Sequence, residues 1–308
     1  MNRLIEYVSS SILFLVVLSV SGCGQPNDLQ VQFRGRTYAY HKVHTEISDL
    51  RSQLVNTRQI ETDHCRIIYC YDFEKLLPEM IALSEEDYLR ISNDFLYHFA
   101  RGKPLIRFLS HQQYQQYRAL DVPSFDSDVP AYTADNGDVV MDLGSSDLQQ
   151  DAGQQILSHE LAHYVLLQLM GGHPSHSAAE HIGSFQAFNE ALAISEEQPP
   201  RIPPRWNECF PAGQYWTFGG MDSAYANGAR ACMFLEMQSL IRLVRRGWGD
   251  RVFHDILGSL GNHSVEQSLS KYTSVTPEQL QSMWFDRMHQ LQGADTTASG
   301  PDTGGKSK

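Results

Sequence analysis

The sequence predicts an α+β fold, in which a mixed β-sheet in the N-terminal half is followed by a mostly helical C-terminal part. Two short segments, 64–73 and 103–110, are rich in the β-branched and aromatic residues that favour strands. Residues 131–144 show a hairpin signal, and most segments after residue 147 have the apolar spacing or the composition of helices. These three observations lead to the α+β assignment.

The composition indicates a folded globular protein. The chain has 308 residues, of which 42% are hydrophobic and 19% are charged, and this suits one or two domains with a substantial core. The net charge is −12 and the pI is about 5.5. Because no stretch has the basic character of a nucleic-acid-binding surface, nucleic acid is not an expected partner.

Residues 1–22 have the pattern of a secretory signal peptide, with Arg3 ahead of an apolar run at 12–20 that is shorter than a typical membrane span. The run ends in Val-Ser-Gly-Cys at 20–23, which resembles the lipobox of bacterial lipoproteins. That resemblance implies cleavage before Cys23 and a lipid anchor on its thiol. It places the protein in the bacterial cell envelope, at the outer membrane and facing the periplasm or the surface. The alternative is an ordinary cleaved signal peptide in which Cys23 has no role.

The rest of the chain divides into three parts. Residues 23–58 are predicted to be a tether and an N-terminal segment, with a mixed stretch at 41–54 that has helical character. Residues 59–292 are predicted to form the main domain. The composition from Gly293 onward predicts a disordered tail, 293–308.

In the first half of the domain, a strand is expected at 64–73 and a helix at 83–100. A second strand at 103–110 precedes a short polar helix. The segment 131–144 contains Asn136-Gly137, the preferred two-residue turn between β-type flanks, and is predicted to be a hairpin.

In the second half, a long helix is predicted from Leu148 to Met170, capped by Asp147 and ended by Gly171-Gly172. A helix of this length crosses a small domain, so its middle is expected to be buried. Further helices are predicted at 184–197, 223–248, 250–260 and 276–291, with an irregular loop at 198–220 that holds five of the 13 prolines.

Four cysteines follow Cys23 in the sequence, namely Cys65, Cys70, Cys209 and Cys232. An even number in an exported protein suggests two disulfides, for which three pairings exist. We favour Cys65–Cys70 and Cys209–Cys232, because each pair is closest in sequence. Free buried thiols are the alternative.

Several common catalytic motifs are missing. The sequence has no G-x-S-x-G nucleophile elbow, no Walker loop and no G-x-G-x-x-G motif. The acidic pairs Glu85-Glu86 and Glu196-Glu197 are adjacent in sequence, so we interpret them as solvated surface groups and not as catalytic carboxylates.

The segment His159-Glu160-Leu161-Ala162-His163 lies inside the predicted long helix. Residues four apart share a helix face, so His159 and His163 present their imidazoles to a common point, as Zn²⁺ requires. Glu160 follows about 100° further around the helix. It can lie beside the ion without binding it and act as a general base. Two surface histidines are the alternative, which the apolar neighbours disfavour.

A catalytic zinc site needs a third protein ligand and an open position. Leu166 and Leu169 stand where a third-histidine motif would have Gly and His, so a carboxylate on a later helix is expected. Glu190 in the predicted helix 184–197 is the candidate. The alternatives are that Glu190 is an exposed helix charge, and that a loop histidine supplies the ligand (His173, His176 or His181).

The order of these segments resembles the gluzincin branch of zincin peptidases, and most of all the bacterial peptidase MA-like group, from about residue 60 to residue 290. The resemblance lies in the strand–helix–strand order, the rim hairpin, the Asn-Glu-Ala-Leu-Ala sequence at 189–193 and the Tyr-x-x-Gly start at Tyr225. It implies a zincin-like metallopeptidase domain at 59–292, with the H-E-x-x-H helix as its active-site helix. The implied zinc ligands are His159, His163 and Glu190, and the implied general base is Glu160.

Tyr225 is a candidate hydrogen-bond donor to the transition state, with a packing role as the alternative, and Tyr215 and His254 are less favoured for the same role. Two positions depart from the family pattern. Ala191 replaces the usual glycine after the third-ligand glutamate, and Ile194 stands where thermolysin-like members have an acid. The groups that orient the metal ligands are therefore left open.

The sequence thus predicts an envelope-anchored zinc metallopeptidase that hydrolyses peptide bonds with a metal-activated water. Its expected partners are a peptide or protein substrate and the membrane, through the lipid anchor at Cys23. One alternative is an envelope lipoprotein with a zincin fold that serves as a binding or assembly factor without peptidase activity. Another is an amide hydrolase that acts on cell-wall peptides. The intact Glu160 favours an enzyme, since a purely structural metal site has no use for a base.

Overall fold

The computed structural model describes residues 29–42, 56–96, 102–121, 129–134, 136–144, 152–171, 182–198, 200, 206–210 and 214–298. These residues form an α+β structure with one mixed sheet of seven strands and a mostly helical C-terminal part. The predicted fold class is confirmed at this level.

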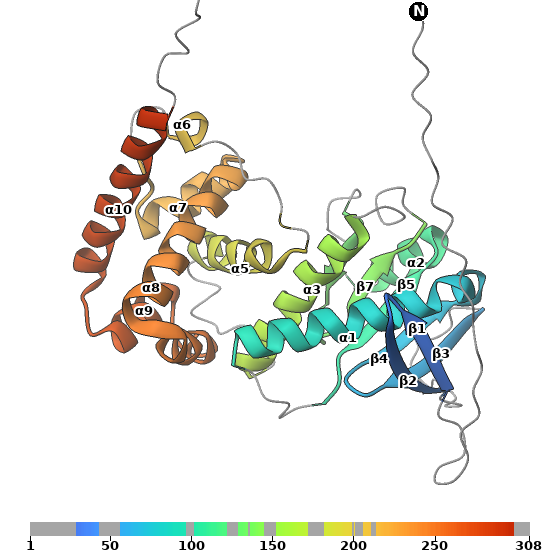
Figure 1. The fold of residues 1–308 in the computed structure, drawn as a ribbon. Helices are drawn as coiled ribbons and strands as arrows, with labels where there is room; N and C mark the ends of the chain where they lie inside the picture. Colours follow the sequence, from blue (N-terminus) through green and yellow to red (C-terminus); the bar gives the residue numbers. More distant parts are fainter. Residues whose placement is uncertain are drawn as a thin grey trace, which may run out of the picture.

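The strands are β1 (Leu29–Phe33), β2 (Arg36–Lys42), β3 (Thr57–Thr62), β4 (Arg66–Cys70), β5 (Leu105–Leu109), β6 (Ala131–Thr133) and β7 (Val139–Asp142). The helices are the 3₁₀ helix η2 (Tyr71–Leu76), α1 (Leu77–Asp94), α2 (His111–Asp121), α3 (Ala152–Leu169), α5 (Ile182–Glu196), α6 (Trp206–Cys209), α7 (Phe218–Ala226), α8 (Arg230–Ser259), α9 (Val265–Thr273) and α10 (Pro277–Ala298). In Figure 1 the strands gather on the right and helices α5 to α10 on the left, with α1 and α3 reaching from one group to the other.

The sheet has the strand order β1-β2-β3-β4-β5-β7-β6. Strands β1 to β4 pair antiparallel, whereas β4, β5 and β7 run parallel to one another. Strand β6 then returns antiparallel to β7 and forms the edge of the sheet. Among the described helices, α3 contacts this edge strand, so the edge and the helix that contains His159 and His163 are neighbours.

The two faces of the sheet contribute to different hydrophobic clusters, because side chains alternate along a strand. Val139 and Met141 of β7 join the large core that includes residues of α1, α3, α5 and α8. Val140 faces the other way, toward α2. That smaller cluster consists of Leu109, Tyr114, Tyr117, Tyr132, Ala134 and Val140. In the edge strand β6, Ala131 joins the large core and Tyr132 joins the smaller cluster, so this strand is also packed on both faces.

Residues 131–144 form the predicted hairpin, but its connection differs from the predicted two-residue turn. Ala134 pairs with Asp138, so three residues lie between them. Gly137 has φ +85°, a conformation that glycine adopts without steric conflict. Buried Arg107 of β5 donates from Nε to Oδ2 of Asp138 at 2.9 Å, which ties the turn to the centre of the sheet.

Residues 29–42 are not part of a tether, which corrects the expectation from the sequence. They form β1 and β2, and Val31 and Phe33 are buried in the core that α1 shares. The signal was the alternation of apolar residues along both strands. The predicted helix at 41–54 begins in β2, and its residues 43–54 lie outside the described residues, as do the predicted signal peptide 1–22 and Cys23.

The C-terminal helices follow the prediction with several differences. The predicted helices 223–248 and 250–260 are joined in α8, which has a break at Gly249, and α6 and the start of α7 lie in the predicted irregular loop 198–220. The expected helix 223–248 is divided between α7 and α8, because Gly228 between them has φ +80°, outside helical geometry. Helix α9 was not predicted; a capping box between Ser264 and Gln267 begins it. Helix α10 continues to Ala298, past the start of the predicted tail at 293.

The long α3 ends at Leu169, one residue before the predicted end at Met170. Its described part begins at Ala152, so the predicted cap Asp147 lies outside the described residues. None of the helices in the described ranges combines the length and the apolar composition that a membrane span needs.

One of the two predicted disulfides is present. Cys209 and Cys232 are bonded and link α6 to the first turn of α8. The prediction of Cys65–Cys70 is wrong, since both are buried free thiols. They lie at opposite ends of the extended strand β4, where five steps of about 3.3 Å separate them by far more than the 7 Å limit between bonded cysteines. Closeness in sequence was misleading because a strand keeps its ends apart.

The Cys209–Cys232 bond should contribute to stability through the loop that it closes. Its sequence separation is 23, and such a loop reduces the entropy of the unfolded chain by an amount worth about 3 kcal/mol. We expect the double variant Cys209→Ser/Cys232→Ser to lose roughly that free energy of unfolding, measured by urea titration. Reductant should destabilise the parent and leave the double variant unchanged. Equal sensitivity of both proteins to reductant would contradict a stabilising role for this bond.

Candidate metal centre

Helices α3 and α5 bring together the residues that the sequence singled out. Leu157, Leu161 and Val165 bury one side of α3 in the core, and these side chains are at most 1% exposed. His159 and His163 project from another side of the same helix toward α5, which packs against α3. The predicted burial of the middle of this helix is therefore confirmed.

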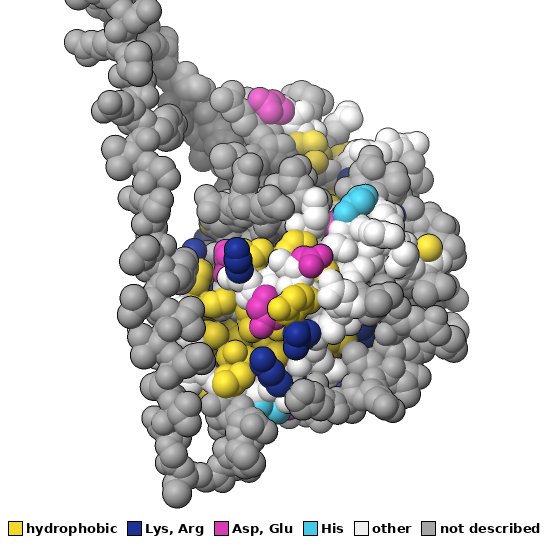
Figure 2. Space-filling model, turned by 90° about the vertical axis from the view of Figure 1, so that its right-hand side faces the viewer, with side chains coloured by type: hydrophobic (Ala, Val, Ile, Leu, Met, Phe, Trp, Pro, Cys, Tyr) yellow, Lys and Arg dark blue, Asp and Glu magenta, His cyan; other side chains and the backbone are white. Residues whose placement is uncertain are grey.

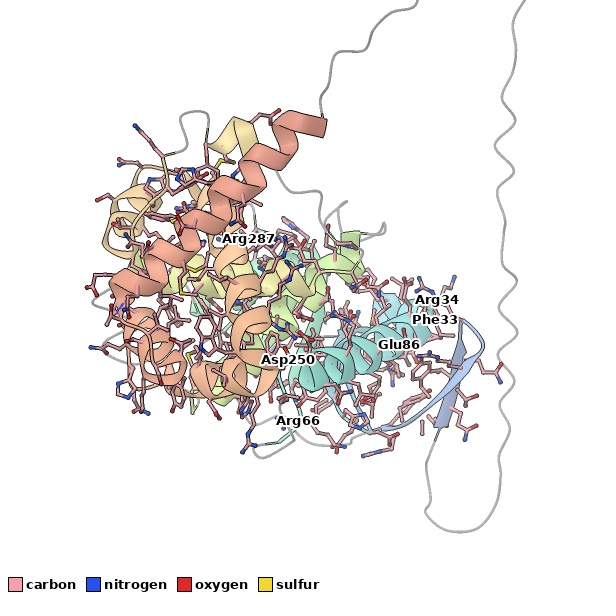
Figure 3. All side chains as sticks on the ribbon, turned by 60° about the vertical axis from the view of Figure 1, so that its left-hand side comes forward. Phe33, Arg34, Arg66, Glu86, Asp250 and Arg287 are labelled. Atoms are coloured by element: carbon pink, nitrogen blue, oxygen red, sulfur yellow. A yellow bond between two sulfur atoms is a disulfide. The ribbon has the colours of Figure 1, made fainter. Side chains whose placement is uncertain are left out.

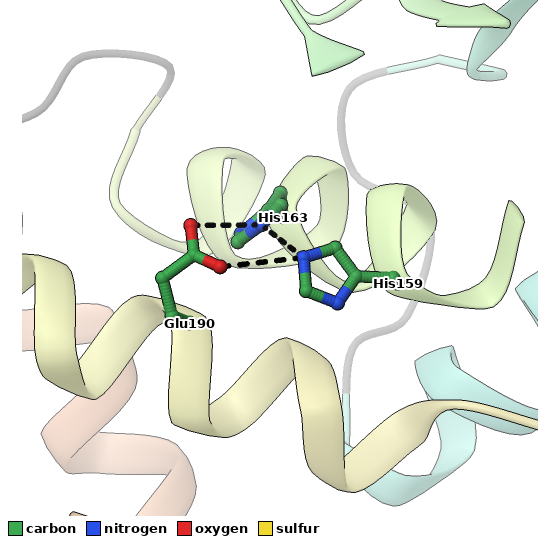
Figure 4. A group of neighbouring side chains, drawn as sticks. All are labelled: His159, His163 and Glu190. Carbon is green, nitrogen blue, oxygen red and sulfur yellow. Dashed lines mark hydrogen bonds and ion pairs between the residues drawn. The ribbon is translucent and has the colours of Figure 1, made fainter. Parts of the chain in front are cut away.

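The ring nitrogens Nε2 of His159 and His163 lie 3.1 Å apart. Glu190 of α5 completes the group: its Oε2 lies 3.5 Å from Nε2 of His159, and its Oε1 lies 3.6 Å from Nε2 of His163. Figure 4 shows the two rings and the carboxylate facing a common point. All ligand atoms of the three residues are within 4.8 Å of one another, so the group could hold a metal ion.

The far nitrogen of each ring is held by a hydrogen-bond acceptor. Nδ1 of His159 lies 3.0 Å from Oε1 of Glu197, and Nδ1 of His163 lies 2.8 Å from Oδ1 of Asn189. Because both partners accept, both Nδ1 atoms donate, and the proton of each neutral ring is on Nδ1. The Nε2 lone pairs are thereby directed into the shared space, where a cation can accept both of them.

The charge around the histidines also favours a cation. Burial alone lowers the pKa of His159, but hydrogen bonds with Glu190 and Glu197 and the negative charge of Glu160 outweigh it and raise the pKa to about 10. Without another cation, the protein therefore holds a proton at this point. Two imidazoles and a carboxylate are ligands that Zn²⁺ prefers, and the residues present fit such an ion.

Glu160 belongs to the same neighbourhood but not to the ligand group. Oγ1 of Thr133, on edge strand β6, lies 2.8 Å from the backbone oxygen of Glu160 and 2.9 Å from its Oε2. Glu160 as a whole residue is 7% exposed, and Thr133 holds its carboxylate at the side of α3 that faces the sheet edge. The threonine thus connects the edge strand to Glu160.

Sequence reasoning missed Glu197, Asn189 and Thr133. We interpreted Glu196-Glu197 as solvated, yet Glu196 is 4% and Glu197 is 0% exposed. A signal was available, because Glu197 lies seven residues after Glu190, two helical turns further on the same side. It takes the orienting role that the family resemblance expected at Ile194.

The other acidic pair is also partly misassigned. Glu85 is buried and is hydrogen-bonded to Thr62 and His64, so it is a structural group and not a solvated one. Glu86 accepts from Arg36 and Tyr38.

The remaining candidates are not brought to the centre by the described contacts. Tyr225 is in α7, but its side chain lies outside the described residues, as do His173, His176 and His181. Tyr215 packs in an aromatic cluster with Phe210 and Phe285. His254 lies on α8 beside Asp255.

Removing either acceptor should loosen the ligand that it orients. We expect Glu197→Ala and Asn189→Ala each to weaken Zn²⁺ binding by about 10- to 100-fold, because an unsupported imidazole loses its orientation. Competition with a chromophoric chelator measures the affinity. The conservative variants Glu197→Gln and Asn189→Asp retain an acceptor oxygen and should lose less. If alanine and conservative variants bind Zn²⁺ as the parent does, these side chains do not orient metal ligands.

Comparison with known proteins identifies no relative. No family model, no curated protein and no solved structure matches the chain. The assignment of a function therefore rests on this chain's own residues and their geometry.

Proposed function

We propose that this protein is a zinc-dependent peptidase with a zincin-like domain at 59–292, anchored to the bacterial envelope. One observation supports the chemistry above the others: the Nε2 atoms of two histidines and the carboxylate of Glu190 converge on one point, with both Nδ1 atoms fixed by acceptors.

His159, His163 and Glu190 would hold the ion. Bound there, Zn²⁺ would polarise a peptide carbonyl and lower the pKa of water to about 7. The presence of three protein ligands, and not four, is typical of catalytic zinc sites.

Glu160 would act as the general base and acid. It accepts a proton from the attacking water and later donates it to the leaving amine. Thr133 holds Oε2 of Glu160 by a hydrogen bond, which leaves Oε1 for the proton transfer. Because the same threonine is on the edge strand, the base and the strand are positioned together.

Edge strand β6 would bind the substrate by strand addition. Backbone hydrogen bonds join Pro130 to Asp142 and Ala134 to Asp138, and Tyr132 pairs with Val140. Alternate residues of an antiparallel strand turn their backbone groups to opposite sides. Those of Ala131 and Thr133 therefore point away from β7, in the direction from which an extended peptide can pair.

The sharpest test separates Glu160 from Glu190. Glu160→Gln should keep Zn²⁺ and the fold, since glutamine can still accept from Thr133. Its peptide turnover should fall by about 10²- to 10⁴-fold, which is the usual contribution of a general base. Glu190→Ala should first lose Zn²⁺ affinity, and its melting temperature should fall to that of the metal-free parent, because an ion that binds the folded state stabilises it. Zinc content and peptide turnover are measured for both.

Exposed Glu79 on α1 provides the matched control. Glu79→Ala should behave as the parent in both measurements. Excess Zn²⁺ should partly restore Glu190→Ala but not Glu160→Gln. Full turnover of Glu160→Gln would show that the peptidase mechanism is wrong, and parental Zn²⁺ affinity of Glu190→Ala would place the third ligand elsewhere.

The envelope anchor rests on the lipobox-like sequence ending at Cys23. Several acyl chains on one residue make membrane binding stable. Cys23→Ser should therefore leave the precursor unprocessed or release the chain from membranes, as seen by fractionation and by mass. A variant that fractionates and migrates like the parent would contradict lipidation of Cys23.

A further inference from the structure

A cavity of about 1100 Å³ lies between the C-terminal ends of α1 and α5 and one side of α8. Apolar residues such as Phe234, Leu235 and Ile241 form part of its lining. The charged residues of the lining are mostly basic, although the chain has a net charge of −12. Among the described residues, five arginines but only two carboxylic acids line it: Arg90, Arg230, Arg242, Arg245 and Arg246, with Asp94 and Glu196.

Helix α8 supplies most of this lining because of its spacing. Arg230, Phe234, Gln238, Arg242 and Arg246 follow one another at intervals of four, so successive members are neighbours on the helix surface and form a row that winds slowly around it. The apolar and the cationic residues therefore line the same space.

Two of the arginines are held by the acids. Arg245 donates to both oxygens of Asp94, at 2.7 and 2.9 Å, and also to Asp250 at 2.8 Å. Figure 3 labels Asp250, which lies where α8 meets α1. Arg90 donates to Oε2 of Glu196 at 2.6 Å. These ion pairs fix the wall between α1, α5 and α8.

These ion pairs do not neutralise all the arginines that line the cavity. Within the described part of the chain, neither Arg242 nor Arg246 forms an ion pair, and both side chains are exposed at the cavity. Elsewhere charge is mixed: on the face shown in Figure 2, Lys and Arg side chains lie beside Asp and Glu side chains around a hydrophobic area. The cavity thus concentrates guanidinium groups that can bind a carboxylate with two parallel hydrogen bonds.

The cavity adjoins the candidate metal centre through one short piece of chain. Ile194, Ser195 and Glu196 at the end of α5 line the cavity. The next residue, Glu197, turns to Nδ1 of His159. The same end of α5 therefore contributes to the metal centre and to the wall of the cavity.

We propose that this cavity is a binding site for acidic side chains of a peptide substrate, with aliphatic side chains against its apolar lining. Arg242 and Arg246 bind the carboxylates, and Arg90 and Arg245 keep the wall in place. The substrate assignment rests on the proposed peptidase function, whereas the binding of acidic peptide does not require turnover.

Binding is tested with the Glu160→Gln variant, loaded with Zn²⁺, so that cleavage does not intervene. The probe is a fluorescein-labelled peptide of alternating leucine and glutamate, and its partner has glutamine in place of every glutamate. Fluorescence anisotropy should show tighter binding of the glutamate peptide, weakening as salt screens the charges. Adding Arg242→Gln/Arg246→Gln should weaken binding of the glutamate peptide several-fold, because it removes two exposed guanidinium partners whose ion pairs are screened by solvent. The glutamine peptide should be unaffected.

Arg251→Gln is the matched control, because Arg251 is an exposed arginine of the same helix that does not line the cavity. It should bind both peptides as the parent does. Arg242→Lys/Arg246→Lys keeps the charge and should recover part of the affinity, which distinguishes binding from a change of fold. Equal affinity for the two peptides, or an equal loss with Arg251→Gln, would overturn the inference. A glutamate preference without peptide turnover in the parent would leave the acidic-peptide site intact and refute only the peptidase.

Discussion

The arrangement of the centre depends on the fixed orientation of two imidazoles. Glu197 and Asn189 accept hydrogen bonds from the Nδ1 atoms of His159 and His163, and this directs both Nε2 atoms to one point, 3.1 Å apart. Without a cation, this geometry would place two lone pairs against each other in a buried setting. With Glu190 beside them, the demand for positive charge is strong enough to raise the pKa of His159 to about 10. A metal ion would satisfy the same demand, with His159, His163 and Glu190 as its ligands.

The sheet serves this centre through its edge. Thr133 on β6 contacts Glu160 of α3, so the position of the proposed base depends on the position of a three-residue strand. Strand β6 is short, and interactions other than its backbone hydrogen bonds to β7 also hold it in place. Tyr132 packs against Tyr114 on the α2 side, and the buried pair of Arg107 and Asp138 fixes the turn that follows. Hydrophobic packing on one face and a buried ion pair at the turn thus restrict the base to one place.

Acidic residues near the end of α5 lie in two different electrostatic environments, one beside the histidines and one beside the arginines of the cavity. Glu190 and Glu197 face the histidines, where negative charge attracts a cation. Glu196, between them and the arginines, is buried, and desolvation together with the nearby Asp94 raises its pKa, while Arg245 lowers the pKa of Asp94. Adjacent residues of one helix end therefore contribute to a cation site and to the wall of an anion-attracting cavity. At this point ion pairs join α1 to α5, through Arg90 and Glu196, and α1 to α8, through Asp94 and Arg245.

Much of the fold could be predicted from local pattern. The strands at β4 and β5, the hairpin at 131–144, the end of α3 at Leu169 and the helices of the C-terminal part follow from β-branched composition, turn residues and helical spacing. The pairing of His159 with His163 also follows from spacing, because the helix repeat alone puts them on one face. By contrast, β1 and β2 lie in the segment 23–58 that is predicted as a tether and N-terminal segment, since an alternating segment near a chain end becomes a strand only when a sheet is there to pair with it.

What the sequence determined by itself was therefore what a single element determines: the two histidines on one helix face, and the carboxylate of Glu190 on a later helix as a candidate. The tertiary structure decided the partners. Glu197 and Glu196 are adjacent acids that look solvated in sequence, and only the tertiary structure buries them, Glu197 beside His159 of α3 and Glu196 beside Arg90 of α1. Cys65 and Cys70 are close in sequence, but the extended strand between them holds them apart. Contacts between distant elements depend on how those elements pack, and no local periodicity specifies that.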